Sequence, residues 1–120
     1  MSPPFQAFRK AQSTFSLPLI ANGNAFLGDL VSSDKSNPSS PVSGGLYRLE
    51  KGEPHTITYS YDEVKIILEG EFTISDATGQ EVKAVPGDIF FIPKHSTITF
   101  STSNYGLAFY GAQRPFFQKK

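Results

Sequence analysis

Four polar residues in one short segment, Tyr59, Tyr61, Glu63 and Lys65, could together perform acid–base chemistry. Residues two apart on a β-strand are separated by roughly 6.5 to 7 Å, so the side chains of Glu63 and Lys65 can reach one another. In a dry cavity a carboxylate and an ammonium stay charged only as a pair, because burial otherwise raises the pKa of the acid and lowers that of the amine. Glu63 could then be a general base and Lys65 its partner or an electrophile, with a tyrosine as proton donor. A desolvated Lys65 could alternatively form a Schiff base with a carbonyl substrate.

The hydropathy pattern of the same segment favours the opposite orientation. The even-numbered positions from 64 to 68 are all apolar, whereas the odd-numbered positions from 63 to 69 are mostly charged. Because side chains alternate between the two faces of a strand, hydropathy alone would bury the even positions and leave Glu63 and Lys65 in water. A surface ion pair of that kind contributes almost nothing to stability.

The composition sets limits on the function. A chain of 120 residues forms one domain, and the absence of cysteine excludes disulfides, thiolate metal sites and a thiol nucleophile. Its 11 basic and 11 acidic residues leave no positive excess for a nucleic-acid partner. No apolar run reaches the length of a membrane span and residues 1–10 lack a signal-peptide core, so we expect a cytoplasmic protein with no membrane partner.

The elements that must position the polar residues are short strands separated by turns. Frequent aromatic and β-branched residues, together with glycine and proline at the turns, predict an all-β antiparallel sandwich or barrel with no convincing helix. We expect an N-terminal arm (1–43), which contains short strands and most of a loop rich in Ser, Pro and Gly over residues 32–45, and a main barrel (44–120). The expected strands cover residues 15–20, 25–31, 46–49, 56–61, 64–68, 72–75, 81–85, 89–92, 97–101 and 105–112.

A few residues narrow the fold further. Glu63 stands seven residues before Gly70, and Pro86-Gly87-Asp88 is followed by Phe91-Ile92-Pro93, which resembles the two-motif frame of the cupin superfamily. The segments 61–63, 67–71 and 91–94 more closely resemble the ethanolamine-utilisation (Q-type) single-domain cupins and their fungal relatives. The resemblance covers about residues 44–115 and implies an antiparallel cupin jelly-roll barrel.

The resemblance also locates the positions at which cupins carry metal-binding histidines. The first two fall on Ile57 and Tyr59, or on Thr56 and Thr58 in a longer spacing, and the third falls near Ile98. None is a histidine, so we expect no metal and no other cofactor. The two histidines of the chain, His55 and His95, are interpreted as rim or surface residues. A displaced metal site that they form with Glu63 is the alternative.

The resemblance implies that Glu63 faces the interior of the barrel, whereas the hydropathy pattern predicts that it faces solvent. The two agree if a second protomer covers the apolar outer face, so we expect a homodimer. A lumen lined by Ile57, Ile98, Phe100 and the tyrosines would suit a small, partly aromatic or unsaturated ligand. Further ligand-binding candidates at the rim are Arg48, His95 and Arg114, and core positions are expected for Phe72, Phe91, Phe100 and Phe109.

These residues favour a metal-independent enzyme that moves protons on a small molecule, as an isomerase, lyase or cyclase. Glu63 would be the base, Lys65 its partner or electrophile, and Tyr59 and Tyr61 would orient the substrate. The alternatives are a non-catalytic ligand-binding or assembly module, and a metal-dependent cupin with unusual ligands. A kinase role, which is attached to some ethanolamine-utilisation relatives, has no local support because no glycine-rich phosphate loop opens a helix.

Overall fold

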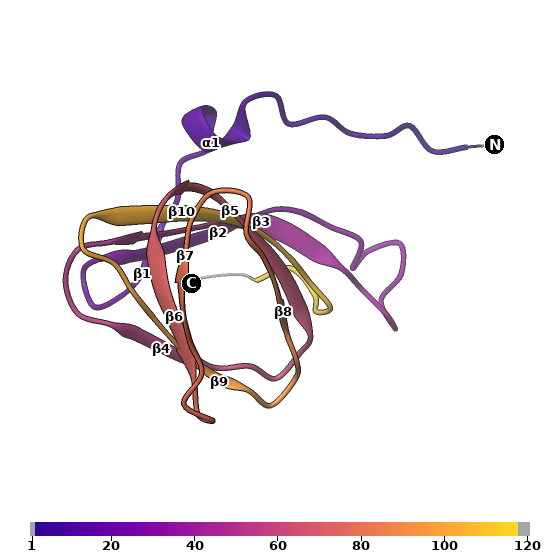
Figure 1. Ribbon diagram of the computed structural model, residues 1–120. Coiled ribbons are helices and arrows are strands. Elements are labelled where there is room, and N and C mark those ends of the chain that lie inside the picture. The colour runs from indigo at the N-terminus through magenta and orange to yellow at the C-terminus, as the bar shows by residue number, and fades with distance from the viewer. Residues whose placement is uncertain (1, 118–120) are drawn as a thin grey trace.

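Ten short β-strands and one helical turn make up the computed structural model, which describes residues 2–117 (Figure 1). The helical turn α1 (Ala11–Thr14) precedes all the strands. The strands are β1 (Leu19–Ala21), β2 (Ala25–Ser32), β3 (Ser43–Glu50), β4 (His55–Thr58), β5 (Glu63–Gly70), β6 (Phe72–Asp76), β7 (Glu81–Ala84), β8 (Ile89–Ile92), β9 (Thr97–Ser101) and β10 (Tyr105–Ala112).

The strands form two antiparallel sheets that face one another (Figure 1). The larger sheet has the order β1-β2-β3-β10-β5-β8 and the smaller has the order β4-β9-β6-β7. At the centre of the larger sheet, β10 pairs along its length with β3 on one side and with β5 on the other. The predicted all-β antiparallel jelly roll is confirmed.

The chain passes from the smaller sheet to the larger one between β4 and β5, where the sequence predicted a single strand over 56–61. Strand β4 ends at Thr58, and the backbone of Tyr59 then exchanges hydrogen bonds with the β8–β9 turn. Asp62 accepts a hydrogen bond from the amide of Gln113. The crossing therefore holds Tyr59 beside the first residue of β5, in the space between the sheets.

Aromatic rings from both sheets fill the interior. Tyr47 and Tyr110 of the larger sheet and Phe72 and Phe100 of the smaller sheet are at most 1% exposed. The Tyr47 ring stacks on that of Phe72, with 5.9 Å between centroids, and contacts Phe100 at 5.3 Å. These contacts fix the spacing of the sheets, because close-packed interiors tolerate little change in volume.

The expectation that four phenylalanines occupy the core is half wrong. Phe72 and Phe100 are buried, but Phe91 is 65% exposed and Phe109 is 39% exposed. Strand alternation explains both errors, since β8 buries Ile92 and β10 buries Tyr110, which turns the adjacent phenylalanines outward.

The N-terminal strands extend the larger sheet at its β3 edge. Strand β2 pairs with β3 from Ala25 to Ser32, and β1 pairs with β2. The helical turn α1 and the residues before it lie across the outer side of that sheet (Figure 1). The division at residue 43 between an arm and a barrel stays a prediction. No helix within residues 2–117 is long and apolar enough to cross a membrane.

Gly45 is required where β3 meets β2 and β10. A Cβ atom there would lie 2.1 Å from the Gly28 carbonyl oxygen and 2.6 Å from the Tyr110 hydroxyl. We expect Gly45→Ala to destabilise the fold by about 3 kcal/mol or more, because backbone atoms must move. Urea unfolding in dilute solution measures this. The matched control is Gly111→Ala, whose Cβ would meet only Val64 Cγ2 at 3.5 Å. Equal stability of the two variants would contradict the account.

Candidate functional site

The side chains of β5 alternate in the opposite sense to their hydropathy. Glu63 is 4% exposed, Lys65 is 3% exposed and Ile67 is 1% exposed, whereas Val64 is 51% exposed. Glu63, Lys65 and Ile67 therefore lie between the sheets, and the even-numbered apolar residues of β5 face outward. Hydropathy alone gave the wrong orientation for this strand.

Glu63 and Lys65 form a buried ion pair. The distance from Lys65 Nζ to Glu63 Oε2 is 2.9 Å, and the Tyr59 hydroxyl donates a hydrogen bond of 3.2 Å to the same oxygen. No group within residues 2–117 donates a hydrogen bond to the other oxygen, Oε1. One carboxylate oxygen thus fixes the group in place, and the second remains a free acceptor.

The ammonium of Lys65 lies among three aromatic rings. Its Nζ is 4.9 Å from the ring centroid of Tyr47, 5.2 Å from that of Tyr110 and 5.4 Å from that of Phe100. The faces of aromatic rings attract cations, and the Glu63 carboxylate does so too. These surroundings favour Lys65 as a cationic partner over Lys65 as a neutral amine for Schiff-base chemistry.

The two tyrosines of the predicted site lie side by side. The Tyr59 and Tyr61 ring centroids are 5.4 Å apart in an edge-to-face arrangement. Burial raises the pKa of the Tyr59 hydroxyl, and the charge of Glu63 raises it further. The pKa of Tyr61 is raised for the same two reasons, although Arg114 opposes the shift. Both phenols stay protonated at neutral pH and can act as hydrogen-bond donors.

A hydrogen-bonded pair that the sequence did not predict borders Lys65 on its other side. The Tyr47 hydroxyl lies 2.7 Å from His55 Nδ1, and His55 is 8% exposed. Burial lowers the pKa of His55, and the Lys65 ammonium lowers it further. The interpretation of His55 as a rim or surface residue was wrong. The signal was present, because His55 has the same parity as Ile57 and Tyr59 on the alternating strand.

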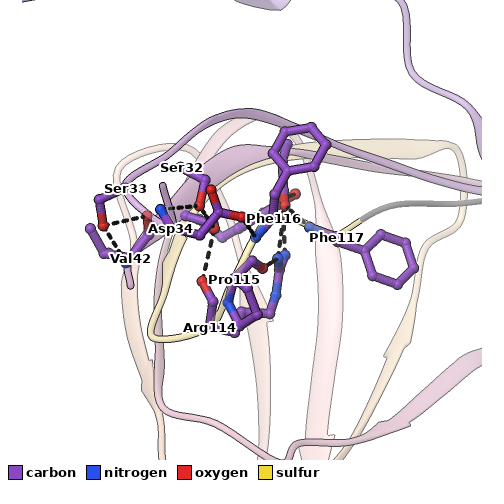
Figure 2. Close-up of polar contacts among 11 residues, drawn as sticks. Ser32, Ser33, Asp34, Val42, Arg114, Pro115, Phe116 and Phe117 are labelled. Carbon is purple, nitrogen blue, oxygen red and sulfur yellow. Dashed lines mark hydrogen bonds and ion pairs between the residues drawn. The ribbon is translucent and has the colours of Figure 1, made fainter. Parts of the chain in front are cut away.

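A second buried ion pair joins β2 to the segment after β10. Arg114 contacts both oxygens of Asp29, at 2.8 and 2.9 Å, and the Tyr110 hydroxyl donates to Asp29 Oδ1 at 2.6 Å. Figure 2 shows this segment against the Ser32–Asp34 loop, where the amide of Phe116 donates to Asp34. The sequence predicts Arg114 as a ligand-binding residue at the rim. In the structure its guanidinium is bound to Asp29 and is therefore not free to hold an anion.

The remaining predicted residues fall into two groups. Ile98 and Phe100 are buried in the core, and the partly buried Ile57 packs against them. Arg48, in contrast, lies on the outer side of β3, where it pairs with Glu50 at 2.9 Å. His95 is exposed in the β8–β9 turn and has a φ of 82°. The structure brings neither Arg48 nor His95 to Glu63, and their ligand-binding role stays a prediction.

A metal does not fit the residues at the positions that the cupin resemblance implies. Within residues 2–117 no three His, Cys, Asp or Glu side chains lie together as metal ligands would. Glu63 is the one carboxylate at those positions, and an ammonium 2.9 Å from it would repel a cation. Phenols and aliphatic side chains cannot replace imidazole donors.

Comparison with known families bears on this geometry. The family model for "Ethanolamine utilisation protein EutQ" matches residues 22–114. The chain belongs to the EutQ family. Its resemblance to the ethanolamine-utilisation cupins is thereby confirmed, and the site at Glu63 lies within the matched residues.

Individual EutQ proteins and a further cupin show how far the likeness extends. "Acetate kinase EutQ" of Escherichia coli is 38% identical over 79 residues, which are 65% of this chain and 31% of that protein. The chain thus spans about a third of that relative. The Salmonella typhimurium EutQ structure is 32% identical, with a TM-score of 0.63, over 78% of this chain and 71% of that one. A cupin superfamily protein of Desulfitobacterium hafniense shares the fold at 18% identity, with a TM-score of 0.64, over 97% and 94% of the two chains.

Substitution of one partner tests how much the buried Glu63–Lys65 pair contributes to the free energy of unfolding. Lys65→Met leaves the Glu63 carboxylate buried without its partner, and we expect it to cost about 3 to 5 kcal/mol of unfolding free energy. The double variant Glu63→Gln with Lys65→Met should cost less than the sum of the single changes, because no charge then remains buried. A urea double-mutant cycle measures this. Arg48→Met is the control, because it breaks an exposed pair and should cost about 1 kcal/mol or less. Additive losses at residues 63 and 65 would contradict the pairing.

The Asp29 pair predicts an acid-dependent stability. Burial alone would raise the pKa of Asp29, but hydrogen bonds from Arg114, Tyr110 and the Phe117 amide together hold it below its ordinary value. A carboxylate with a lowered folded pKa adds stability above its unfolded pKa of about 3.9, and this stability is lost as pH falls through the folded value. The difference in unfolding free energy between wild type and Asp29→Asn should therefore be largest at neutral pH and shrink below about pH 4. A difference that does not change with pH would contradict this assignment.

Proposed function

We propose that this EutQ-family cupin is a metal-independent enzyme that transfers protons on a small organic molecule, with Glu63 as the base. The observation that carries the proposal is that the two carboxylate oxygens of Glu63 have different surroundings. Oε2 is held by Lys65 at 2.9 Å and by Tyr59 at 3.2 Å, whereas Oε1 accepts no hydrogen bond from residues 2–117. A general base needs a fixed carboxylate with one oxygen free to accept a proton.

The chemistry follows from the neighbours of that oxygen. Oε1 would take a proton from a carbon next to a carbonyl or carboxyl group, and the electron pair of the broken C–H bond would move onto the carbonyl oxygen. The Lys65 ammonium and the Tyr59 or Tyr61 hydroxyl would stabilise the charge on that oxygen. Return of the proton to another carbon gives isomerisation. Departure of a leaving group gives elimination, and attack within the molecule gives cyclisation.

A ligand at Glu63 would have to be small, because aromatic rings from both sheets fill the interior and Glu63 lines none of the three hollows on residues 2–117. The rings of Tyr47, Phe100 and Tyr110 lie around the Lys65 ammonium, and Ile98 belongs to the same buried core. Such walls exclude water and strengthen electrostatic effects on a substrate. A partly unsaturated carbonyl or carboxylate compound suits these walls better than a sugar, which needs many hydrogen-bonding partners.

One observation favours a non-catalytic binding or assembly module as the second candidate. Three hollows on residues 2–117, of about 960, 620 and 300 Å³, are lined by residues of the N-terminal segment, the larger sheet and its loops. Neither Glu63 nor Lys65 lines any of them, so a ligand in these hollows would not meet the acid–base pair. The kinase activity named for the Escherichia coli relative is not proposed here. The shared region is 31% of that protein, and this sequence lacks a glycine-rich phosphate loop.

Hydrogen–deuterium exchange into a bound ligand tests the proposal. Small carbonyl and carboxylate metabolites are first screened by thermal shift, where a ligand at a hundredfold excess over its Kd stabilises by about 2.7 kcal/mol, or several degrees. Each ligand that binds is then incubated with the protein in D₂O, and loss of its C–H signal is followed by NMR. We expect exchange with wild type and a loss of at least about 100-fold with Glu63→Gln.

Glu50→Gln is the matched control, since it neutralises a partly exposed carboxylate and should leave exchange unchanged. Binding without exchange would move the non-catalytic candidate ahead. Exchange that persists in Glu63→Gln would show that another residue is the base.

A further inference from the structure

The two tyrosines of the site differ in whether their hydroxyl proton is free. Tyr59 donates its one proton to Glu63 Oε2 at 3.2 Å and has none left for a ligand. The Tyr61 hydroxyl donates to no acceptor within residues 2–117, although its ring lies 5.4 Å from that of Tyr59. It is also not a buried orphan, because within residues 2–117 Asn24 Oδ1 is the only buried side-chain nitrogen or oxygen without a hydrogen-bond partner. Of the two phenols, only Tyr61 can donate to a bound molecule.

The oxygen Oε1 of Glu63 is open in the same sense. It accepts no hydrogen bond within residues 2–117, and it is not a buried atom without a partner. The site therefore offers a free proton acceptor on Glu63 and a free proton donor on Tyr61. Removal of a proton from the carbon next to a carbonyl is easier when the carbonyl oxygen receives a proton at the same time.

The guanidinium of Arg114 lies against the Tyr61 ring. Its Cζ atom is 5.3 Å from the ring centroid. Asp29 holds the guanidinium in this place through two contacts, of 2.8 Å from Nη1 to Oδ2 and of 2.9 Å from Nη2 to Oδ1. A planar guanidinium that binds a carboxylate through two nitrogens has little freedom to turn, so the contact with Tyr61 is fixed.

The charge of Arg114 acts on Tyr61 even though Asp29 occupies the guanidinium. The charged and titratable groups that face Tyr61 are Tyr59, Glu63, Arg114 and Asp29. Burial and the charge of Glu63 raise the pKa of Tyr61, the charge of Arg114 opposes the rise, and the contrary effect of Asp29 is smaller. A cation beside a phenol stabilises the phenolate that remains when the proton leaves.

The same ion pair also reaches the ammonium side of the site. The Tyr110 hydroxyl donates to Asp29 Oδ1 at 2.6 Å, and the Tyr110 ring centroid lies 5.2 Å from Lys65 Nζ. Arg114 Cζ is 5.6 Å from that centroid. The Asp29–Arg114 pair therefore contacts one ring beside Lys65 and another beside Tyr59, in addition to joining β2 to the segment after β10.

We propose that Tyr61 is the acid that protonates the substrate oxygen while Glu63 removes the carbon proton, and that Arg114 is the positioning residue that prepares Tyr61 for this step. The inference rests on the proposed function. As Glu63 Oε1 takes the proton, the electron pair of the broken C–H bond forms a carbon–carbon double bond. The carbonyl π pair takes the Tyr61 proton, which gives an enol and a phenolate beside Arg114. The phenolate takes its proton back when the enol returns to a carbonyl compound.

A difluorotyrosine at position 61 tests the contact with Arg114 without any ligand. It ionises at lower pH than tyrosine, and its ¹⁹F signal reports the midpoint. Arg114→Gln can still bind Asp29 but carries no charge, so we expect the midpoint to rise by about one pH unit. Arg114→Lys keeps the charge and should move the midpoint less. Arg48→Gln is the matched control, because this guanidinium lies 4.5 Å from the Tyr105 ring centroid on the outer side of β3 and should leave the midpoint unchanged.

A double variant keeps this measurement possible if Arg114→Gln does not fold. Asp29→Asn with Arg114→Gln removes both buried charges, so neither remains without its partner. The midpoint should still rise, because Arg114 acts on Tyr61 more strongly than Asp29 does.

The deuterium-exchange assay on a bound ligand tests Tyr61 as the acid. Tyr61→Phe removes only the hydroxyl and should slow exchange by about 100-fold or more. Tyr105→Phe is the matched control, because it removes a hydroxyl that donates to Glu69 and should leave exchange unchanged. With difluorotyrosine at position 61, exchange should begin to fall at a lower pH than in wild type, since the acid must be protonated and now ionises earlier. A residue with only a structural role would not move this alkaline limb.

The contrary outcomes separate this inference from the proposed function. A midpoint that does not change in Arg114→Gln or in the double variant would remove Arg114 from the step. Exchange that is lost in Glu63→Gln but persists in Tyr61→Phe would leave Glu63 as the base and overturn Tyr61 as the acid. The absence of exchange from every ligand that binds wild type would overturn both the proposed function and this inference.

Discussion

The ion pair between Glu63 and Lys65 is the constraint on which the rest of the interior depends. Removal of two charges from water costs several kcal/mol per ion, and an arrangement of this kind persists only when geometry and neighbouring hydrogen bonds compensate. The compensation comes from both sheets. The Tyr59 hydroxyl binds the carboxylate, and three ring faces surround the ammonium. The arrangement depends on three features of the fold. The inward face of β5 carries both charged residues, the crossing between β4 and β5 positions Tyr59, and the spacing of the sheets positions the rings.

A second buried ion pair, between Asp29 and Arg114, connects β2 to the segment after β10. As at Glu63, the carboxylate is stabilised by an opposite charge and by a tyrosine hydroxyl. Each of these buried charges is thus matched by a partner within residues 2–117. The site at Glu63 combines one free carboxylate oxygen with an ammonium and two protonated phenols. We propose that this combination serves proton transfer.

The sequence was sufficient for the fold because turns and alternation are local properties. Pro86-Gly87-Asp88 and Gly70 mark their turns, and eight of the expected strands lie from residue 46 onward where the structure has them, apart from the crossing after Thr58. The orientation of β5 was not a local property. Its hydropathy pointed one way and the cupin resemblance the other, and only the packing of both sheets decides between them.

The candidate site was also predictable only where its residues are close together in the sequence. Glu63 and Lys65 were found from their types and spacing, but His55, Asp29 and the Tyr110 hydroxyl were not, since their partners are distant in sequence. Tyr47 and His55 are joined only when β3 and β4 lie in opposite sheets. Arg48 lies on the outer side of β3 beside Glu50, which a single strand pattern cannot predict, and its ligand-binding role stays a prediction.

The central claim is that Lys65 is a buried ammonium bonded to Glu63, and its own NMR signal tests this most directly. A ¹H–¹⁵N correlation spectrum of the lysine side chains at neutral pH should show one slowly exchanging ammonium resonance, shifted by the surrounding rings. That resonance should vanish in Lys65→Met and change strongly in Glu63→Gln. If every lysine ammonium exchanges rapidly with water, as exposed lysines do, then Lys65 is not held in the interior and the account of the site is wrong.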